Sequence, residues 1–104
     1  MPALLNRWEI RDPSKARDWG LAALQFCRVQ RGRDDVEASR YWLSTATEIS
    51  VLTEFKPGAT VSPGGDTPEG AKAIADMMTL SRNVCNEVWS DARASSETLT
   101  RAGV

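Results

Sequence analysis

The stretch Asn83-Val84-Cys85-Asn86-Glu87-Val88-Trp89 decides the fold of this chain, because it either continues the helical pattern before it or forms a separate strand. We predict a strand over 84–89, since β-branched and aromatic residues favour extended structure. Asn83 is then a suitable terminator for a helix that begins near Thr67. The alternative, one helix that continues through Trp89, stays open at this point.

The rest of the chain shows the patterns of three strands, two longer helices and one short terminal helix. Asp12-Pro13-Ser14 is typical of a helix start, and apolar residues at spacings of three and four follow it. Two strand-like runs are joined by only three residues, which predicts a hairpin. The predicted elements are a strand over 3–11, a helix over 14–30, strands over 36–44 and 48–55, a loop over 56–67, a helix over 67–82, and a short helix over 92–102.

The composition is that of an ordinary globular domain. The 104 residues are 41% apolar and 26% charged, and 13 basic side chains face 14 acidic ones. No run approaches the roughly 20 apolar residues of a membrane span, and the first residues show no secretory signal. The basic cluster Arg28, Arg31 and Arg33 is followed by Asp34-Asp35, which cancels most of its field. We expect one domain over residues 1–104, located in the cytoplasm and bound to neither nucleic acid nor membrane.

Metal and cofactor motifs are missing from the sequence. The chain has no histidine, and its two cysteines form no CxxC pair. The glycines match neither a phosphate loop nor a dinucleotide fingerprint, and the acidic groups lack calcium-loop spacing. We therefore expect no cofactor and no metal.

The order strand, helix, strand, strand, helix, strand predicts an α+β, ferredoxin-like βαββαβ domain. Such a domain has a four-stranded antiparallel sheet with both helices on one face, here followed by the short C-terminal helix. Trp8, Trp42 and Trp89 fall on strands, and we expect them on the uncovered face. Because a soluble protein seldom leaves such aromatic area in water, we predict a two-fold homodimer through the sheet face.

With this order and length, the chain resembles the dimeric α+β barrel group of ferredoxin-like domains. That group contains cofactor-independent antibiotic-biosynthesis monooxygenases and haem-degrading enzymes. Leu4-Leu5-Asn6-Arg7-Trp8-Glu9-Ile10, followed by Pro13-Ser14-Lys15, looks like the first strand and helix entry of the haem-degrading branch, where an asparagine that Asn6 matches points into the pocket. The chain lacks a histidine for haem iron and a tryptophan in its second helix. Arg40-Tyr41-Trp42 and Trp89-Ser90-Asp91-Ala92-Arg93 look more like small actinobacterial proteins of no assigned function.

Three pairs of strand residues are the candidate ligand-binding residues. Residues two apart share a strand face, which holds for Asn6 with Trp8, Arg40 with Trp42, and Glu87 with Trp89. On one common face they would form aromatic walls with an amide, a guanidinium and a carboxylate, as in a small-molecule pocket. The alternative is that the tryptophans form a dimer core, with Arg40 and Glu87 paired at its rim.

The sequence offers no nucleophile beside a base, so no catalytic residue is assigned. The leading hypothesis is a cytosolic homodimer with a small-molecule pocket on the sheet face. The resemblance implies that it could act as a cofactor-independent monooxygenase, binding an electron-rich aromatic and stabilising its anion with donors such as Asn6, Arg40 or a tryptophan N–H. The alternative is a non-catalytic dimerisation or regulatory module.

Overall fold

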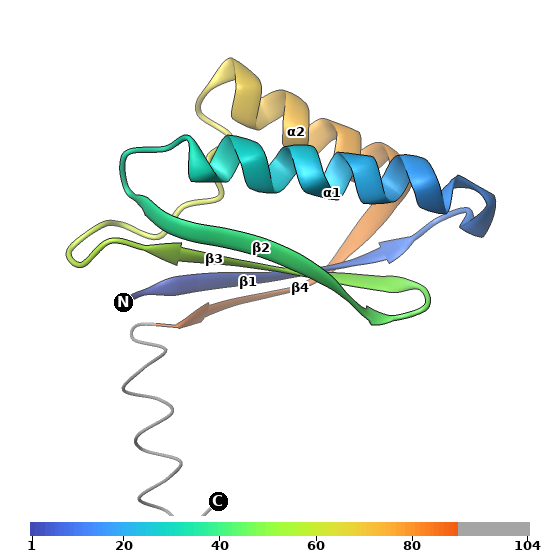
Figure 1. The fold of residues 1–104 in the computed structure, drawn as a ribbon, viewed down its shortest axis with the longest axis horizontal. Helices are drawn as coiled ribbons and strands as arrows, with labels where there is room; N and C mark the ends of the chain where they lie inside the picture. The colour runs from blue at the N-terminus through green and yellow to red at the C-terminus, as the bar shows by residue number, and fades with distance from the viewer. Residues whose placement is uncertain (90–104) are drawn as a thin grey trace, which may run out of the picture.

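Four strands form one antiparallel sheet, and two helices cover one of its faces (Figure 1). The structure, a computed structural model, describes residues 1–89. The helix predicted for 92–102 lies outside the described residues. Along the chain the elements are β1 (Ala3–Ile10), the 3-10 helix η1 (Pro13–Lys15), α1 (Ala16–Arg31), β2 (Val36–Thr45), β3 (Glu48–Phe55), α2 (Pro68–Leu80) and β4 (Ser81–Trp89).

The strand order β2-β3-β1-β4, with every neighbouring pair antiparallel, is that of a ferredoxin-like sheet. The predicted fold class is therefore confirmed. The deciding stretch 84–89 is a strand, and β4 starts earlier than predicted, at Ser81. Within residues 1–89, no helix is long and apolar enough to cross a membrane.

Side-chain caps define where the helical segments begin. The Asp12 carboxylate accepts the backbone N–H of Ser14 at 3.0 Å, and η1 follows. The Thr67 hydroxyl oxygen accepts the backbone N–H of Gly70 at 3.0 Å at the start of α2. A proline occupies the first turn in both cases, where a missing N–H loses no bond.

The end of α2 differs from the prediction. The helix ends at Leu80, and Ser81 has extended backbone angles. The Ser81 hydroxyl donates to the carbonyl oxygen of Met77 at 2.6 Å, so it caps the last turn while β4 begins. Asn83, the predicted terminator, instead lies within β4.

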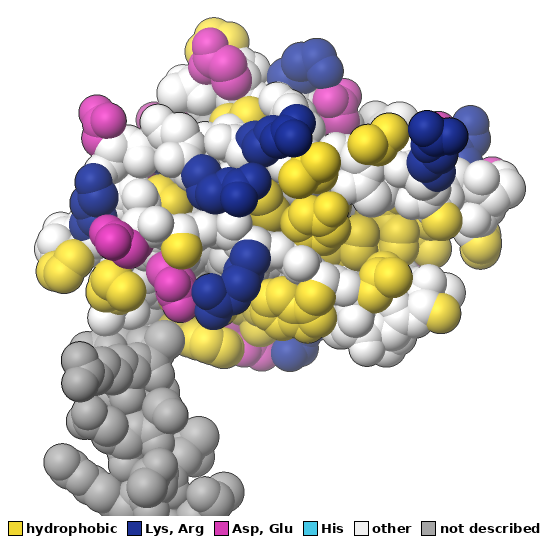
Figure 2. Space-filling model, viewed as in Figure 1, with side chains coloured by type: hydrophobic (Ala, Val, Ile, Leu, Met, Phe, Trp, Pro, Cys, Tyr) yellow, Lys and Arg dark blue, Asp and Glu magenta, His cyan; other side chains and the backbone are white. Residues whose placement is uncertain are grey.

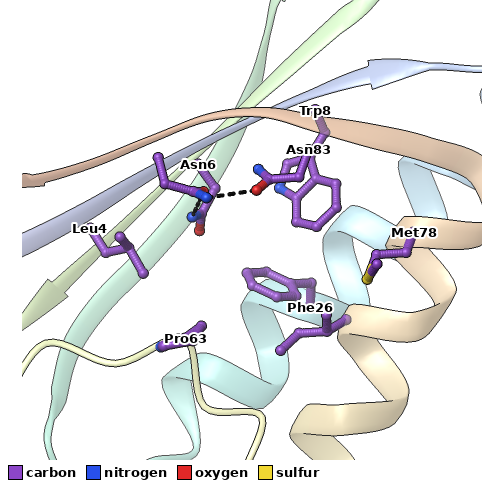
Figure 3. A pocket seen from close by; sticks show the side chains of 9 residues that line it. Leu4, Asn6, Trp8, Phe26, Pro63, Met78 and Asn83 are labelled. Atoms are coloured by element: carbon purple, nitrogen blue, oxygen red, sulfur yellow. Dashed lines mark hydrogen bonds between the residues drawn. The ribbon is translucent and has the colours of Figure 1, made fainter.

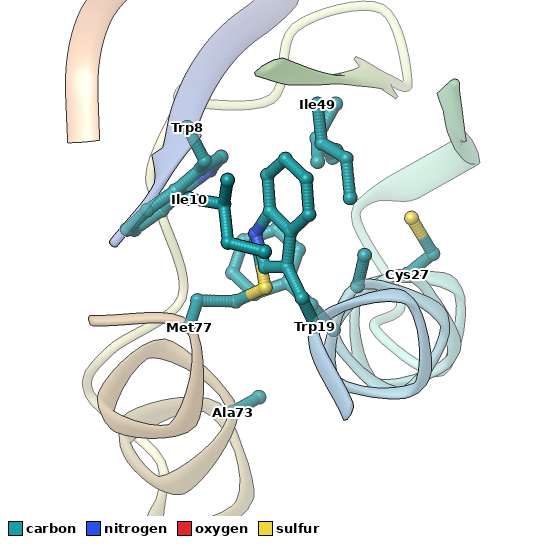
Figure 4. Close-up of a cluster of buried hydrophobic side chains, with 10 residues drawn as sticks. Trp8, Ile10, Trp19, Cys27, Ile49, Ala73 and Met77 are labelled. Atoms are coloured by element: carbon teal, nitrogen blue, oxygen red, sulfur yellow. The ribbon is translucent and has the colours of Figure 1, made fainter. Parts of the chain in front are cut away.

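The hydrophobic core lies between the sheet and the helices (Figure 4). Trp19 and Phe26 of α1 are each 2% exposed, as their helical spacing predicts. The Trp8 and Phe26 rings meet edge to face, with centroids 6.4 Å apart. The core also contains Ile49 of β3 and Met77 of α2, so each layer contributes large side chains.

Trp8 corrects our assignment of the strand faces. We expected it on the uncovered face, but it is 4% exposed and belongs to the core beneath the helices. Since β1 side chains alternate, Asn6 shares this helix-side face. Arg7 and Glu9 alternate with Asn6 and Trp8 along β1 and lie on the opposite face, which we call the open face.

The open face combines a small apolar cluster with paired charges. Ala3, Leu5 and Leu52 are buried there against Trp89, and the more exposed Trp42 lies on the same face of the neighbouring strands. The charged contacts on this face are Arg7 with Glu48 at 3.8 Å and with Glu87 at 3.9 Å, Arg82 with Glu9 at 3.1 Å, and Arg40 with Glu54 at 3.5 Å.

The loop before α2 is fastened to the end of α1 by Arg33 and Gln30. Arg33 donates to the carbonyl oxygen of Ser62 at 2.9 Å and to the Gln30 side-chain oxygen at 2.8 Å. Gln30 in turn donates to the carbonyl oxygen of Pro63 at 2.9 Å. Two further Arg33 nitrogens donate to the two Asp35 carboxylate oxygens at 3.0 and 2.9 Å. These bonds hold Pro63 in a fixed place beside the helices.

The substitution Arg33→Lys tests this fastening. Lysine keeps the charge but cannot make the parallel bonds to Asp35 and reach Ser62 at once, so we expect the free energy of unfolding to fall by about 1–3 kcal/mol. Arg40→Lys is the matched control, because Arg40 is 60% exposed and makes one 3.5 Å contact with Glu54. It should change stability by less than about 0.5 kcal/mol. Urea unfolding followed by circular dichroism measures both, and equal effects would contradict the expectation.

Two helical glycines give a second matched pair. A Cβ at Gly70 would overlap the carbonyl oxygen of Gly64, whereas a Cβ at Gly20 meets nothing within 4 Å. We expect Gly20→Ala to stabilise the protein by about 0.5–1 kcal/mol through helix propensity. Gly70→Ala should destabilise it by about 1–3 kcal/mol, because α2 and the loop must move apart. A thermal melt of each variant tests this, and a stabilising Gly70→Ala would show that the close approach is not required.

Candidate functional site

A pocket of about 390 Å³ lies between the sheet and the two helices, beside the core (Figure 3). Its apolar wall consists of Leu4, Trp8, Phe26, Pro63, Ile74 and Met78, and its polar groups are the amides of Asn6, Asn83 and Asn86. The pocket therefore draws residues from β1, α1, α2, β4 and the loop before α2, and within residues 1–89 none of its lining side chains is charged.

The three amides form one hydrogen-bonded chain. Asn6 Nδ2 donates to Asn86 Oδ1 at 2.6 Å, and Asn86 Nδ2 donates to Asn83 Oδ1 at 2.7 Å. Asn83 Nδ2 donates to the backbone carbonyl oxygens of Arg7 at 3.0 Å and Cys85 at 3.4 Å. The chain thus begins at the backbone of β1 and β4 and ends at Asn6.

The indole N–H of Trp8 is a further polar group in the pocket wall. It is buried and has no hydrogen-bond partner within residues 1–89. Buried donors without partners are uncommon in folded proteins, and they merit an explanation where they occur. Trp8 lines the pocket together with the end of the amide chain, but its indole nitrogen is itself fully buried.

The six predicted site residues lie on two faces of the sheet. Asn6 and Trp8 line the pocket beneath the helices. The other four lie on the open face, and the structure does not bring them together with the first pair: Arg40, Trp42, Glu87 and Trp89. The spacing of two fixes the face within one strand, but it carries no information on which faces of different strands coincide. Ligand binding by these four residues stays a prediction.

Arg40 and Glu87, which the dimer-core alternative pairs at its rim, do not contact each other within one chain. Arg40 contacts Glu54 on the neighbouring strand β3. Glu87 accepts the indole N–H of Trp89 at 3.3 Å and lies 3.9 Å from Arg7. The two predicted partners are thus separated by the width of the sheet, since β2 and β4 are its opposite edges.

Sequence reasoning missed Asn83 and Asn86 as site residues. They were treated only as a helix terminator and a strand residue. The available signal was that asparagine is depleted in strands, so two asparagines in one short strand are unusual. Pro63 and Met78 also line the pocket, and Pro63 belongs to the loop predicted over 56–67.

The titratable groups near the core do not provide an activated nucleophile. Burial raises the pKa of the Cys27 thiol, and this outweighs the hydrogen bond from Ser39 and the nearby Arg31, which lower it. Cys27 is therefore held as a neutral thiol in the core. In the part of the chain that the structure describes, no cluster of Cys, Asp and Glu side chains is arranged to hold a metal ion.

Comparison with known proteins gives structural neighbours only. No protein-family model matches the chain, and no curated protein matches its sequence. Rv0793 from Mycobacterium tuberculosis has a TM-score of 0.70 at 13% identity, covering 88% of this chain and 95% of that one. The crystal structure of an antibiotic biosynthesis monooxygenase has a TM-score of 0.73 at 9% identity, with 88% and 99% covered. A conserved protein of unknown function from Bacteroides thetaiotaomicron has a TM-score of 0.69 at 9% identity, covering 85% of this chain and 94% of that one.

At such low identities these neighbours establish the architecture and leave the chemistry to the residues of the pocket. The matched region includes 94% or more of each of these three neighbours' chains. The resemblance indicated by the sequence is confirmed at the level of the fold: the chain has the ferredoxin-like α+β fold of antibiotic-biosynthesis-monooxygenase-like proteins.

Proposed function

We propose that this protein binds a small, flat and largely apolar organic molecule in the pocket between the sheet and the helices. The observation that supports this is a cavity of about 390 Å³ whose wall is apolar except for amide side chains. Ligand pockets commonly span about 300–1,000 Å³ and combine such a wall with a few polar groups. A completely filled core would favour the alternative, a non-catalytic dimerisation or regulatory module.

The lining side chains favour an uncharged ligand. Trp8 and Phe26 offer ring surfaces against which a flat molecule can pack. Among residues 1–89, no lysine, arginine or carboxylate lines the pocket to compensate a buried charge, so a charged ligand would lose its hydration without gaining a partner there. Amides can satisfy hydroxyl, carbonyl or N–H groups of a neutral molecule.

The reaction that we propose for this ligand is oxidation by O2 without a cofactor. A fold shared with an antibiotic biosynthesis monooxygenase supports this class. The lining residues that the structure describes include no nucleophile and no titratable base, so their part is to bind, orient and shield the substrate. The substrate then supplies the electrons: a ring C–H of a naphthol or hydroquinone becomes a carbonyl of the quinone product, with one oxygen atom of O2 entering the product and the other leaving as water.

We also propose that the protein is a homodimer through the open face, in the cytoplasm. This face carries the exposed Trp42 and the cluster Ala3, Leu5, Leu52 and Trp89 among paired charges. In Figure 2, apolar and charged side chains lie next to one another on the surface along the β2 edge of the sheet. A second copy turned by a two-fold axis covers an identical surface, because the same patch serves both subunits.

Blocking the pocket tests the binding proposal. Met78 lines the pocket and Leu21 lies on α1 outside it, yet both are 55% exposed. We expect Met78→Trp to weaken binding of naphthols and hydroquinones at least about tenfold by filling the space, and Leu21→Trp to leave it unchanged. Isothermal titration calorimetry measures the affinity, and an oxygen electrode measures uptake with the same panel.

The outcomes separate binding from catalysis. Binding without oxygen uptake would retain the pocket and eliminate the monooxygenase assignment. Uptake that persists at the wild-type rate in Met78→Trp would place the reaction elsewhere or attribute it to spontaneous oxidation. If no member of the panel binds the wild-type protein, the dimerisation or regulatory module becomes the better hypothesis.

The dimer has its own test. Trp42 and Leu43 are adjacent on β2 and both exposed, but their side chains lie on opposite faces of the sheet. Sedimentation velocity of the wild-type chain at micromolar concentration should show a dimer. Trp42→Glu should shift it to a monomer, since a carboxylate would be buried unpaired, and Leu43→Glu should not. A monomeric wild-type chain would contradict the proposal.

A further inference from the structure

The direction of the amide chain is fixed by its backbone end. Backbone carbonyl oxygens accept hydrogen bonds and never donate them. Because Asn83 contacts the carbonyl oxygens of Arg7 and Cys85, its Nδ2 atom must be the one that faces them. This orientation is therefore set by chemistry, although nitrogen and oxygen of an amide are otherwise hard to distinguish.

Each following amide inherits its orientation from the one before. With its Nδ2 atom engaged, Asn83 presents Oδ1, which requires a donor, and Asn86 supplies Nδ2 at 2.7 Å. Asn86 then presents Oδ1, and Asn6 supplies Nδ2 at 2.6 Å. At each contact the reversed arrangement would bring two oxygens or two nitrogens together.

The free end of the chain is the Oδ1 atom of Asn6. Within residues 1–89 this oxygen accepts no hydrogen bond, although the Asn6 residue is only 6% exposed. Unlike the indole nitrogen of Trp8, this oxygen is not fully buried, and Asn6 lines the pocket. Figure 3 shows the Asn6 amide pointing into the space between Leu4 and Phe26.

We propose that Asn83 and Asn86 fix Asn6 as a hydrogen-bond acceptor, so that the pocket selects a neutral ligand through a hydroxyl or N–H group that donates to Asn6 Oδ1. This inference rests on the proposed binding of a small molecule, and it adds that the ligand carries a hydrogen-bond donor for Asn6 Oδ1. Asn83 contacts the backbone and Asn86, and acts as a positioning residue for Asn6. A phenol or a hydroxylated aromatic fits this pattern, and its methyl ether does not.

The inference reverses the expectation that Asn6 stabilises a substrate anion as a donor. A phenolate oxygen has no proton to donate. Placing it against the Asn6 amide oxygen brings its negative charge next to the negative end of the amide dipole, which is repulsive. In the described part of the chain, residues 1–89, no charged residue lines the pocket to offset that repulsion. The protonated form of an ionisable ligand is therefore the form that binds.

The test compares 2-naphthol with 2-methoxynaphthalene at neutral pH by isothermal titration calorimetry. The wild-type protein should bind the naphthol about tenfold more tightly than the ether, the change expected for one hydrogen bond to a buried group. In Asn83→Ala the ratio of naphthol affinity to ether affinity should fall toward one, while the affinity for the ether is kept. The reason is that the side-chain amides of Asn86 and Asn6 can then turn to the opposite orientation. Arg82→Ala, an exposed neighbour on the open face, should keep the wild-type preference.

Two further measurements protect the test against loss of folding in Asn83→Ala. Asn6→Leu removes the acceptor at similar volume and should also abolish the preference. With wild-type protein alone, affinity for 4-nitrophenol should fall as pH rises through the ligand's pKa, whereas affinity for 4-nitroanisole should stay constant.

The failure of this inference differs from the failure of the proposed function. If the wild-type protein binds naphthol and ether equally well, or binds 4-nitrophenolate more tightly than 4-nitrophenol, the assigned polarity is overturned and the pocket stands. A preference that survives in Asn83→Ala would overturn the positioning role. If neither naphthyl compound binds the wild-type protein, the proposed function itself is contradicted.

Discussion

The packing of Trp8 against Phe26 determines which face of β1 meets the helices, and the site follows from that choice. Burying such a ring contributes about 2–3 kcal/mol, more than any exposed contact on the other face. Alternation along β1 then carries Asn6 into the same apolar layer. A buried amide is costly without partners, so Asn6 depends on β4 to supply them. One aromatic contact thus accounts for both the core and the polar end of the pocket.

The pocket also depends on a wall that neither helix provides. Two helices cover only part of a four-stranded sheet, and the loop before α2 closes the remaining side with Pro63 (Figure 1). Such a loop would leave carbonyl groups without donors, and Arg33 and Gln30 supply them at Ser62 and Pro63. Fastening the loop in advance lowers the entropic cost of binding, because less of the wall must be ordered by the ligand.

The sequence was sufficient for the order of elements and insufficient for their facing. Helix and strand periods and the caps at Asp12 and Thr67 depend only on residues close in sequence, so the order of the elements could be predicted. The structure confirms that order. The strand over 84–89 is likewise indicated by residues within the segment itself, namely its β-branched and aromatic side chains. The facing of Trp8 relative to Trp42 depends on packing between segments distant in sequence. Because β1 has apolar residues on both faces, its alternation alone did not reveal which face is covered.

The amide chain shows most clearly why part of the site was not predictable. Asn83 and Asn86 are three positions apart, so a regular strand would place them on opposite faces. An irregularity in the pairing of β1 with β4 leaves Val84 as an extra residue, and both amides then reach the pocket. The carbonyl oxygens that orient Asn83 belong to Arg7 and Cys85, the paired residues beside this bulge. The same backbone irregularity therefore places the amides and sets the direction of their hydrogen bonds, and neither property is written in the spacing of the residues.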